Sequence, residues 1–304
     1  IAFSRVMVGG QPPLAGATES WSWCAIDFRS GIRCEADERA LIWWVCAVLI
    51  GNFVLAFLVL VWGGVNAPYG RYSSAVDKGE KGLVMRAMAK VDIPAKAAWV
   101  IQESPTLIAA AVCCATGSPE CLGSWGNRLA LFCFSAHYVN RTIVYPLLLE
   151  GSKPIPLAVV SMATMFCALN GYIQCRSLTR HLVTGRDGLG LGSVLGFALW
   201  LLGLGINVDS DRRLRNLRKP GETGYKIPRG GMFELVSGAN FFGEILEWIG
   251  YALVTGCAMP GVTFALCTAC NIGPRALAHH AWYREKFEDY PRSRSALVPF
   301  WPAS

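Results

Sequence analysis

Apolar residues along this chain gather in long runs separated by shorter polar stretches. The clearest run, Leu41–Trp62, reads LIWWVCAVLIGNFVLAFLVLVW and contains no charged side chain. A helix needs about 20 apolar residues to cross the roughly 30 Å hydrocarbon core of a bilayer. We therefore predict a transmembrane helix here rather than a signal peptide, whose apolar core is shorter.

Six further runs complete a predicted bundle of seven helices. They cover Ala97–Thr116, Leu129–Leu149, Ile155–Tyr172, Leu189–Val208, Ser237–Thr255 and Gly256–Ile272. The predicted fold class is therefore all-α, an integral membrane bundle of seven transmembrane helices. We expect residues 41–304 to form one membrane domain and residues 1–40 to be a non-cytosolic segment, to which the sequence assigns no role.

The composition agrees with a membrane protein. Hydrophobic residues make up 53% of the 304 residues and charged residues only 16%, whereas soluble domains usually contain about 25% charged residues. The net charge of +7 is scattered over separate loops, so we predict no binding of nucleic acid.

Lys and Arg predict the orientation of the bundle. In a seven-helix chain the loop at 63–96, the loop at 209–235 and the tail after residue 272 fall on one side, and all three are rich in these residues. Positively charged loops stay in the cytosol, so the N-terminus is expected on the opposite side. Three residues oppose this pattern, because they fall in a predicted non-cytosolic loop: Arg176, Arg180 and Arg186.

Most of the twelve cysteines lie inside the predicted helices, where a thiol behaves as a small apolar residue. The CTAC sequence at 267–270 has C-x-x-C spacing, but it lies in an apolar helix without a second pair, and we predict no metal site. Cys24 and Cys34 differ, because an oxidising compartment on the non-cytosolic side would permit a disulfide between them.

Ionisable residues inside the predicted helices are the main functional candidates, because burying them in a bilayer is costly. Four segments carry polar residues at helical spacing. They are Gln102–Glu103; His137, Arg141 and Tyr145 with Tyr138 beside them; Ser237, Asn240, Glu244, Glu247 and Tyr251; and Arg275, His279 and Tyr283. Any one of these stripes could be a structural network between helices, but four of them indicate a shared polar cavity.

The stretch NVDSDRRLRNLRKPGETGY at 207–225 extends this cavity toward the cytosol. Asn207, Asp211, Arg215 and Arg218 lie at i, i+4, i+8 and i+11, so a continuing helix would place them on one face. Membrane topology alone would require only Lys and Arg. Because the guanidinium fork suits phosphate, we predict a site for a large anion. Arg275 would contribute to it.

Soluble nucleotide-binding motifs are absent from the sequence. There is no Walker motif, and GLGLGSVLG at 188–196 lacks the third glycine of G-x-G-x-x-G and leads into an apolar run. If the anion is a dinucleotide, it must bind inside the helical bundle.

Six stretches of the chain resemble the steroid 5α-reductase family of membrane enzymes. In chain order they are NAPYGRY, AAWVIQESP, HYVNRTIVYP, NGYIQ, INVDSDRRLRNLRKPGETGYKIPRGGMFELVSGANFFGEILEWIGYAL and HHAWYREKFEDYPRSRSALVPF. The block at 206–253 is the most specific of them, whereas residues 1–60 match weakly.

This resemblance implies a multi-pass enzyme of the endoplasmic reticulum membrane that reduces the Δ4 double bond of a 3-oxo steroid with NADPH. The steroid would enter from the lipid bilayer and NADPH from the cytosol. By motif position, Glu103 and Tyr138 would meet the 3-carbonyl. The implied cofactor contacts are Asn207, Asp211, Arg218, Tyr225, Asn240, Glu244, Arg275, His279 and Tyr283.

The expected reaction uses the conjugation of the double bond with the carbonyl. An acid that hydrogen-bonds to the carbonyl makes the β-carbon more electrophilic, so we predict that Tyr138 and Glu103 polarise the 3-oxo group. Hydride is then delivered to C5 and a proton is added at C4. Asp209 and Asn140 stand where family members usually have His, so the sequence does not identify the steroid.

Two alternatives stay open at this point. One is a related membrane reductase that acts on a polyprenol or an enoyl thioester. The other is a non-enzymatic seven-helix protein, such as a receptor or a transporter, although transporters commonly contain internal repeats and none is visible here. The sequence leaves the oligomeric state undefined.

Overall fold

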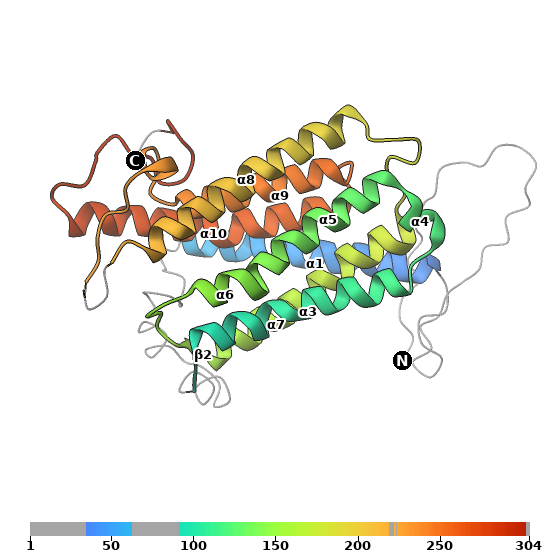
Figure 1. Ribbon diagram of the computed structural model, residues 1–304, viewed down its shortest axis with the longest axis horizontal. Coiled ribbons are helices and arrows are strands. Elements are labelled where there is room, and N and C mark those ends of the chain that lie inside the picture. Colours follow the sequence, from blue (N-terminus) through green and yellow to red (C-terminus); the bar gives the residue numbers. More distant parts are fainter. Residues whose placement is uncertain (1–34, 63–90, 219–221, 223, 302–304) are drawn as a thin grey trace, which may run out of the picture.

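The computed structural model describes residues 35–62, 91–218, 222 and 224–301, and helices dominate this part of the chain (Figure 1). The α-helices are α1 Glu35–Trp62, α3 Ala95–Ala115, α4 Pro119–Gly123, α5 Trp125–Val139, α6 Tyr145–Leu148, α7 Leu157–Arg176, α8 Leu191–Arg215, α9 Ala239–Val254 and α10 Met259–Lys286. The wider π-helical turns η2 Asn140–Val144 and η3 Ser177–His181 continue α5 and α7, and the 3₁₀ turn η4 Gly231–Glu234 precedes α9.

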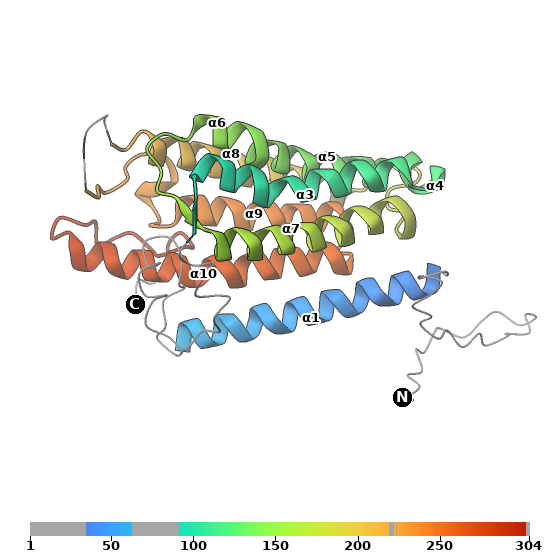
Figure 2. The ribbon, with the colours of Figure 1, turned by 90° about the horizontal axis from the view of Figure 1, so that it is seen from below.

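The long helices lie side by side along the longest axis of the molecule, and α1 runs along one side of the bundle (Figures 1 and 2). A short antiparallel pair, β1 Asp92–Ile93 with β2 Ile155–Pro156, joins the starts of α3 and α7. The loop that leaves α8 and the C-terminal end of α10 lie at one end of the bundle. The helix α4 and the start of α1 lie at the other end.

Within the described residues, four helical segments are long and apolar enough to cross a membrane: Asp37–Trp62, Ala95–Ala115, Leu157–His181 and Leu191–Arg215. The structure thus agrees with an all-α membrane protein. Of the other three predicted spans, α5 ends after 15 residues in the η2 turn and α9 has 16 residues, or about 24 Å at 1.5 Å per residue. The prediction of seven spans stays a prediction.

Three predicted boundaries differ from the structure. The first helix does not begin at Leu41, because α1 begins at Glu35. The last helix does not end at Ile272 but continues as α10 to Lys286. The prediction that Arg218 shares a helical face with Asp211 is wrong, because α8 ends at Arg215. The sequence that follows includes Pro220, which disfavours helical backbone just ahead of it.

Two predictions lie outside the described residues. They are the disulfide between Cys24 and Cys34 and the structure of the NAPYGRY stretch at 66–72.

A glycine seam joins α8 to α9 and determines how the site is built. A Cβ atom on Gly203 would lie 2.3 Å from the backbone nitrogen of Glu247, and one on Gly243 would lie 2.6 Å from that of Asn207. Because only glycine permits so close an approach, the two backbones touch. Polar side chains beside these glycines are therefore brought into one narrow region.

Aromatic and small side chains fill the core between α5, α8 and α9. Phe134, Trp200, Trp248 and Tyr251 are each at most 1% exposed. Rings of Phe134 and Trp248 meet at 6.1 Å, and those of Trp248 and Tyr251 meet edge to face at 5.6 Å. Such packing fixes side-chain positions because protein interiors tolerate few voids.

The C-terminal segment after α10 folds back onto the loop before α9. Val236 and Ser295 form a parallel bridge, supported by the bond from Ser237 N to the Ser295 carbonyl at 2.9 Å. Arg294 is fully buried and donates to the Pro228 carbonyl at 2.9 Å. The segment therefore ties the α8–α9 loop to the end of α10.

The three arginines that opposed the topology rule have local partners at the α4 end of the bundle. Arg176 is paired with Glu38 at 2.7 Å, Arg186 with Glu120, and Arg180 donates to the Thr116 carbonyl. Two of the three charges are therefore paired with a carboxylate within the protein.

Candidate functional site

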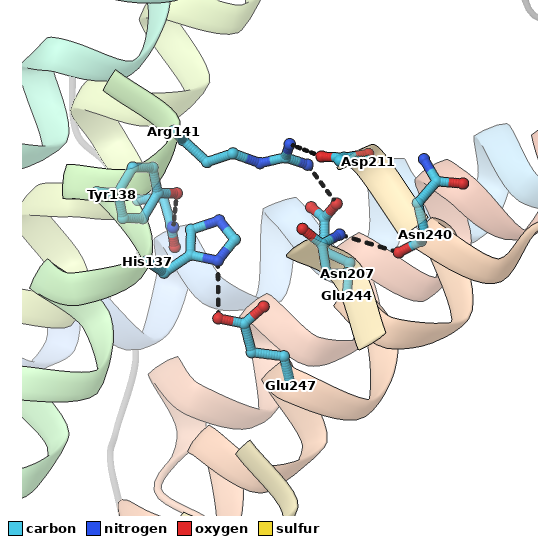
Figure 3. Close-up of polar contacts among 9 residues, drawn as sticks. His137, Tyr138, Arg141, Asn207, Asp211, Asn240, Glu244 and Glu247 are labelled. Atoms are coloured by element: carbon cyan, nitrogen blue, oxygen red, sulfur yellow. Dashed lines mark hydrogen bonds and ion pairs between the residues drawn. The ribbon is translucent and has the colours of Figure 1, made fainter. Parts of the chain in front are cut away.

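An arginine on η2 forms the centre of a buried polar cluster (Figure 3). Arg141 donates from one nitrogen to Asp211 at 2.9 Å and from another to Glu244 at 2.8 Å. The three side chains are at most 19% exposed. Charge-assisted bonds of this kind are strong, and the guanidinium holds together three helical segments that are distant in sequence.

The widened η2 turn positions this arginine. Pro146 at the start of α6 has no N–H to bond back into the helix, so the regular ladder cannot continue through it. Instead the N–H of Tyr145 bonds to the Asn140 carbonyl, five residues earlier. Turns of this type are frequent at functional sites.

Aromatic rings enclose the Arg141 guanidinium. Its central carbon lies 5.3 Å from the ring centroid of Trp99 and 5.2 Å from that of Tyr145. Both distances fall within the range of cation–π attraction. Arg141 is thus fixed by two carboxylates and two rings, which gives it little freedom to move.

A second buried contact, between a histidine and a glutamate, also lies inside the bundle. His137 Nδ1 is 2.8 Å from Glu247 Oε1, and the two side chains are 4% and 0% exposed. The other Glu247 oxygen has no hydrogen-bond partner in the described part of the chain. The His137 ring packs against Trp248 at 4.5 Å and against Tyr138 at 5.3 Å, so its orientation is fixed.

Asparagine side chains continue the cluster along the glycine seam. Asn207 donates to the Asn240 carbonyl at 3.0 Å. Its side-chain oxygen is buried and has no partner among the described residues. A buried polar atom without a partner is costly, and it marks a position where a ligand with an N–H donor would be stabilised.

Glu103 and Tyr138 are brought together through α7. Glu103 accepts from Gln102 at 3.0 Å and from the Cys167 thiol at 3.4 Å, and Asn170 donates to the Tyr138 hydroxyl at 3.4 Å. Because Cys167 and Asn170 are one turn apart on α7, the carboxyl group and the phenol lie in the same region. Tyr138 is 3% exposed.

Sequence reasoning missed the amide network that supports Tyr138. Gln174 bonds to Asn170 at 3.1 Å and to the Pro260 carbonyl at 2.7 Å, and Tyr251 donates to Gln174 at 3.2 Å. The signal was present, because Asn170 and Gln174 lie at i and i+4 in an otherwise apolar helix. His137, Arg141 and Glu247 were on predicted stripes, but no role had been given to them.

The predicted cofactor residues divide into two groups. Asn207, Asp211, Asn240 and Glu244 meet at the α8–α9 seam, as described above. On α10, Arg275 lies over the ring of Phe241 at 5.1 Å and His279 lies beside the same ring at 5.6 Å. Because Phe241 follows Asn240 in α9, this pair borders the first group.

The other three predicted cofactor residues lie toward the end of the bundle. Tyr283 is buried and stacks on Tyr290 at 5.4 Å, and Tyr225 meets Trp282 edge to face at 4.8 Å. Arg218 is exposed beyond the end of α8. The structure therefore does not bring Arg218 into the buried cluster.

His280, the neighbour of His279, has a structural environment. Its Nδ1 lies 2.6 Å from the Ser237 hydroxyl, which also lies 2.6 Å from the Tyr290 hydroxyl. Burial, together with the nearby Arg284, lowers the pKa of His280 below its usual value. The neutral ring thus helps to tie the C-terminal segment to the start of α9.

Comparison with known proteins identifies the class. The family model described as 3-oxo-5-alpha-steroid 4-dehydrogenase matches residues 153–301. The chain is 46% identical over 273 residues to 3-oxo-5-alpha-steroid 4-dehydrogenase 1 of Bos taurus, a match that covers 88% of this chain and 99% of the relative. The corresponding protein of Mus musculus is 48% identical over 268 residues, with the same coverage.

A second type of relative is also similar. The chain is 41% identical over 261 residues to 3-oxo-5-alpha-steroid 4-dehydrogenase 2 of Rattus norvegicus, which covers 83% of this chain and 96% of the relative. These relatives define the class of this protein: the helical membrane bundle with its buried polar cluster is an oxidoreductase. The chain belongs to the 3-oxo-5α-steroid 4-dehydrogenase, or steroid 5α-reductase, family, which confirms the resemblance of the six stretches.

Proposed function

We propose that this protein reduces the Δ4 double bond of 3-oxo steroids to the 5α product, with NADPH as the reductant. The observation that carries the proposal is the position of Glu103 and Tyr138. They lie on facing helices beside the Arg141 cluster, in a chain that is 46% identical to a relative named for this reaction.

The cluster fits a nicotinamide dinucleotide. The buried Asn207 oxygen without a partner suits an N–H donor such as a carboxamide. Arg141 neutralises part of the charge of Asp211 and Glu244, which would otherwise repel the phosphates, and Arg218 and Arg275 lie nearer the end of the bundle at which a phosphate would enter. When bound, NADPH would supply the hydride for C5.

Glu103 and Tyr138 would act on the steroid carbonyl. A carboxyl and a phenol that both hydrogen-bond to the 3-oxo group draw electron density from C5 and stabilise the enolate that forms. The surrounding apolar side chains exclude water, which strengthens these bonds. Asn170 fixes the hydroxyl of Tyr138, so the donor is held in place before the steroid arrives.

The same proposal includes the orientation. We place seven spans of a domain at 41–304 in the endoplasmic reticulum membrane, with 209–235 and the C-terminal tail in the cytosol. The described residues of both segments lie at one end of the bundle (Figure 1), in agreement with the Lys and Arg pattern. A tag placed after Ser304 should be cleaved by protease added to sealed microsomes. Full protection of that tag would contradict this orientation.

The decisive assay for the reaction follows NADPH oxidation by the purified protein in lipid nanodiscs. A 3-oxo-Δ4 steroid should be consumed with equimolar NADPH, and mass spectrometry should show two added hydrogens. A polyprenol and an enoyl thioester serve as competing substrates. Turnover of either one without turnover of the steroid would refute the proposal, as would a lack of turnover with every substrate.

A further inference from the structure

Reduction of a conjugated double bond requires two different deliveries. A hydride is added at C5 and a proton at C4, and the groups assigned so far act on the oxygen at C3. The residue that delivers the proton has not been assigned. The His137–Glu247 pair is buried, lies in the same region and has no place in the steps described above.

We propose that His137, held by Glu247, is the catalytic acid that donates the proton to C4. This assignment rests on the proposed function. We assign the Nδ1–H of His137 as the donor and the Glu247 carboxylate as the acceptor of this hydrogen bond. A carboxylate in this position fixes the ring and stabilises the imidazolium, while the opposite nitrogen is left to carry the proton that is transferred.

The geometry directs that second nitrogen toward the site. In Figure 3 this nitrogen points away from Glu247, toward the side of the ring on which Arg141 lies, while Nδ1 faces Glu247. The ring lies edge to face with Tyr138 at 5.3 Å, the residue assigned to the carbonyl. C4 is the carbon next to the carbonyl carbon, so a donor beside Tyr138 is near the atom that needs a proton.

The step balances. Hydride from the nicotinamide brings two electrons and one hydrogen to C5, and the electron pair of the C4–C5 double bond moves to give the enolate of C3. The C3 carbonyl re-forms as C4 takes the proton from Nε2 of His137. The steroid has gained two hydrogens, the dinucleotide has lost two electrons, and neutral His137 recovers a proton from water.

The chain contains a matched control for this pair. His181 lies 2.8 Å from Glu38, and its side chain is 5% exposed, so the contact resembles that of His137 with Glu247. The control pair, however, lies at the α4 end of the bundle, at the start of α1 and the end of η3. If the histidine–glutamate contact serves only stability, loss of His137 and loss of His181 should have similar effects. If His137 delivers the proton, only the loss of His137 should slow turnover.

The experiment compares His137→Gln, Glu247→Gln and His181→Gln in nanodiscs. It measures kcat in H₂O and in D₂O, KM for NADPH and melting temperature. We expect His137→Gln to lower kcat by about 10²-fold or more, the usual effect of losing a positioned acid. The solvent isotope effect should increase because proton transfer becomes the slowest step. KM for NADPH should be unchanged, and His181→Gln should keep the wild-type kcat and isotope effect.

Glu247→Gln tests the pair without removing the ring. The amide can still bond to Nδ1 but does not stabilise the positive charge, so kcat should fall less than in His137→Gln and the isotope effect should again increase. This variant decides the question if His137→Gln does not fold.

Two results would overturn the assignment. One is wild-type kcat in a folded His137→Gln or Glu247→Gln protein. The other is a lower kcat and melting temperature with an unchanged isotope effect, which would make the pair structural. If wild-type protein does not reduce any 3-oxo-Δ4 steroid, the proposed function itself has failed and this assignment falls with it.

Discussion

Two clusters in this protein use the same residue types for different purposes. The inner cluster joins Arg141 to Asp211 and Glu244, and His137 to Glu247, at 2.8–2.9 Å. The outer cluster, at the α4 end, joins Glu38 to Arg176, His181 and Tyr172 at 2.6–2.8 Å. Bond lengths and residue types do not distinguish them.

The difference lies in what each cluster leaves unsatisfied. In the outer cluster a single carboxylate receives three donors, which tie α1 to the end of α7. In the inner cluster a Glu247 oxygen and the Asn207 oxygen are buried without partners among the described residues. Unpaired buried acceptors are costly, and these two atoms support the proposal that a ligand binds at the inner cluster. To compare two buried polar clusters of this kind, the atoms to examine are therefore those that have no hydrogen-bond partner.

The largest expected effect is on turnover, and it should distinguish Glu103, which is proposed to act on the steroid carbonyl, from Glu38 in the outer cluster. Glu103→Gln should leave folding and NADPH binding nearly intact, because Gln is similar in size and polar. Its turnover should fall by roughly 10²–10⁴, while Glu38→Gln should keep wild-type kcat. Measurement of kcat and melting temperature on the same preparations tests this, and a stable Glu103→Gln protein with wild-type turnover would end the catalytic assignment.

Tyr138→Phe should lower kcat to a similar extent, because the donor to the carbonyl is lost while the ring that packs on Phe134 remains. Combined with Glu103→Gln, the loss should be smaller than the product of the two single losses, because groups that act as a unit are not additive. Steady-state rates of the three variants test this. Fully multiplicative losses would show that the two residues act independently.

Removal of the arginine charge from each cluster compares how much the two clusters contribute to stability. Arg141→Gln leaves the buried Asp211 and Glu244 facing each other without a cation, and the free energy of unfolding should fall by about 3–5 kcal/mol. Arg176→Gln should cost less, because Tyr172 and His181 still bond to Glu38. Denaturation in a mild detergent compares the two variants, and equal losses would contradict the distinction.

A smaller effect is expected at the exposed end of the site. Arg218→Ala should weaken NADPH binding by about 1.5–3 kcal/mol if one charged hydrogen bond is lost, and NADH binding should change less because it lacks the 2′-phosphate. Titration with each nucleotide measures this. Arg212→Ala, another exposed arginine near the end of α8, is the control, and equal NADPH affinity in the two variants would show that Arg218 serves only topology.

The smallest effect concerns pH. The folded state lowers the pKa of His280 below its usual value of about 6.5, so the unfolded chain binds more protons at mildly acidic pH. His280 therefore contributes stability above that value, and the contribution is lost as pH falls through the folded pKa. The melting temperature should fall from pH 7.5 to 5.5, and less so in His280→Gln. Equal slopes in the two proteins would contradict this.

Much of the fold was predictable because the formation of a membrane helix depends mainly on the residues within that helix. Leu41–Trp62 lies within α1, and Leu189–Val208 covers the first part of α8, which continues to Arg215. A long apolar run has few other stable states in lipid. The spacing of Asn207 and Asp211, or of Asn240 and Glu244, likewise follows from 3.6 residues per turn. The extension of α10 to Lys286 was not predicted, because polar residues lower its hydropathy without breaking the helix.

The sequence by itself determined the all-α membrane class, the family and the polar stripes, because each depends on the order of residues within one segment. Only the tertiary structure decided which stripes meet. Gly203 and Gly243 bring α8 and α9 into backbone contact, the η2 turn directs Arg141 onto both, and the chain leaves the helix before Arg218. Contacts between distant segments depend on packing, which periodicity within a single helix does not encode.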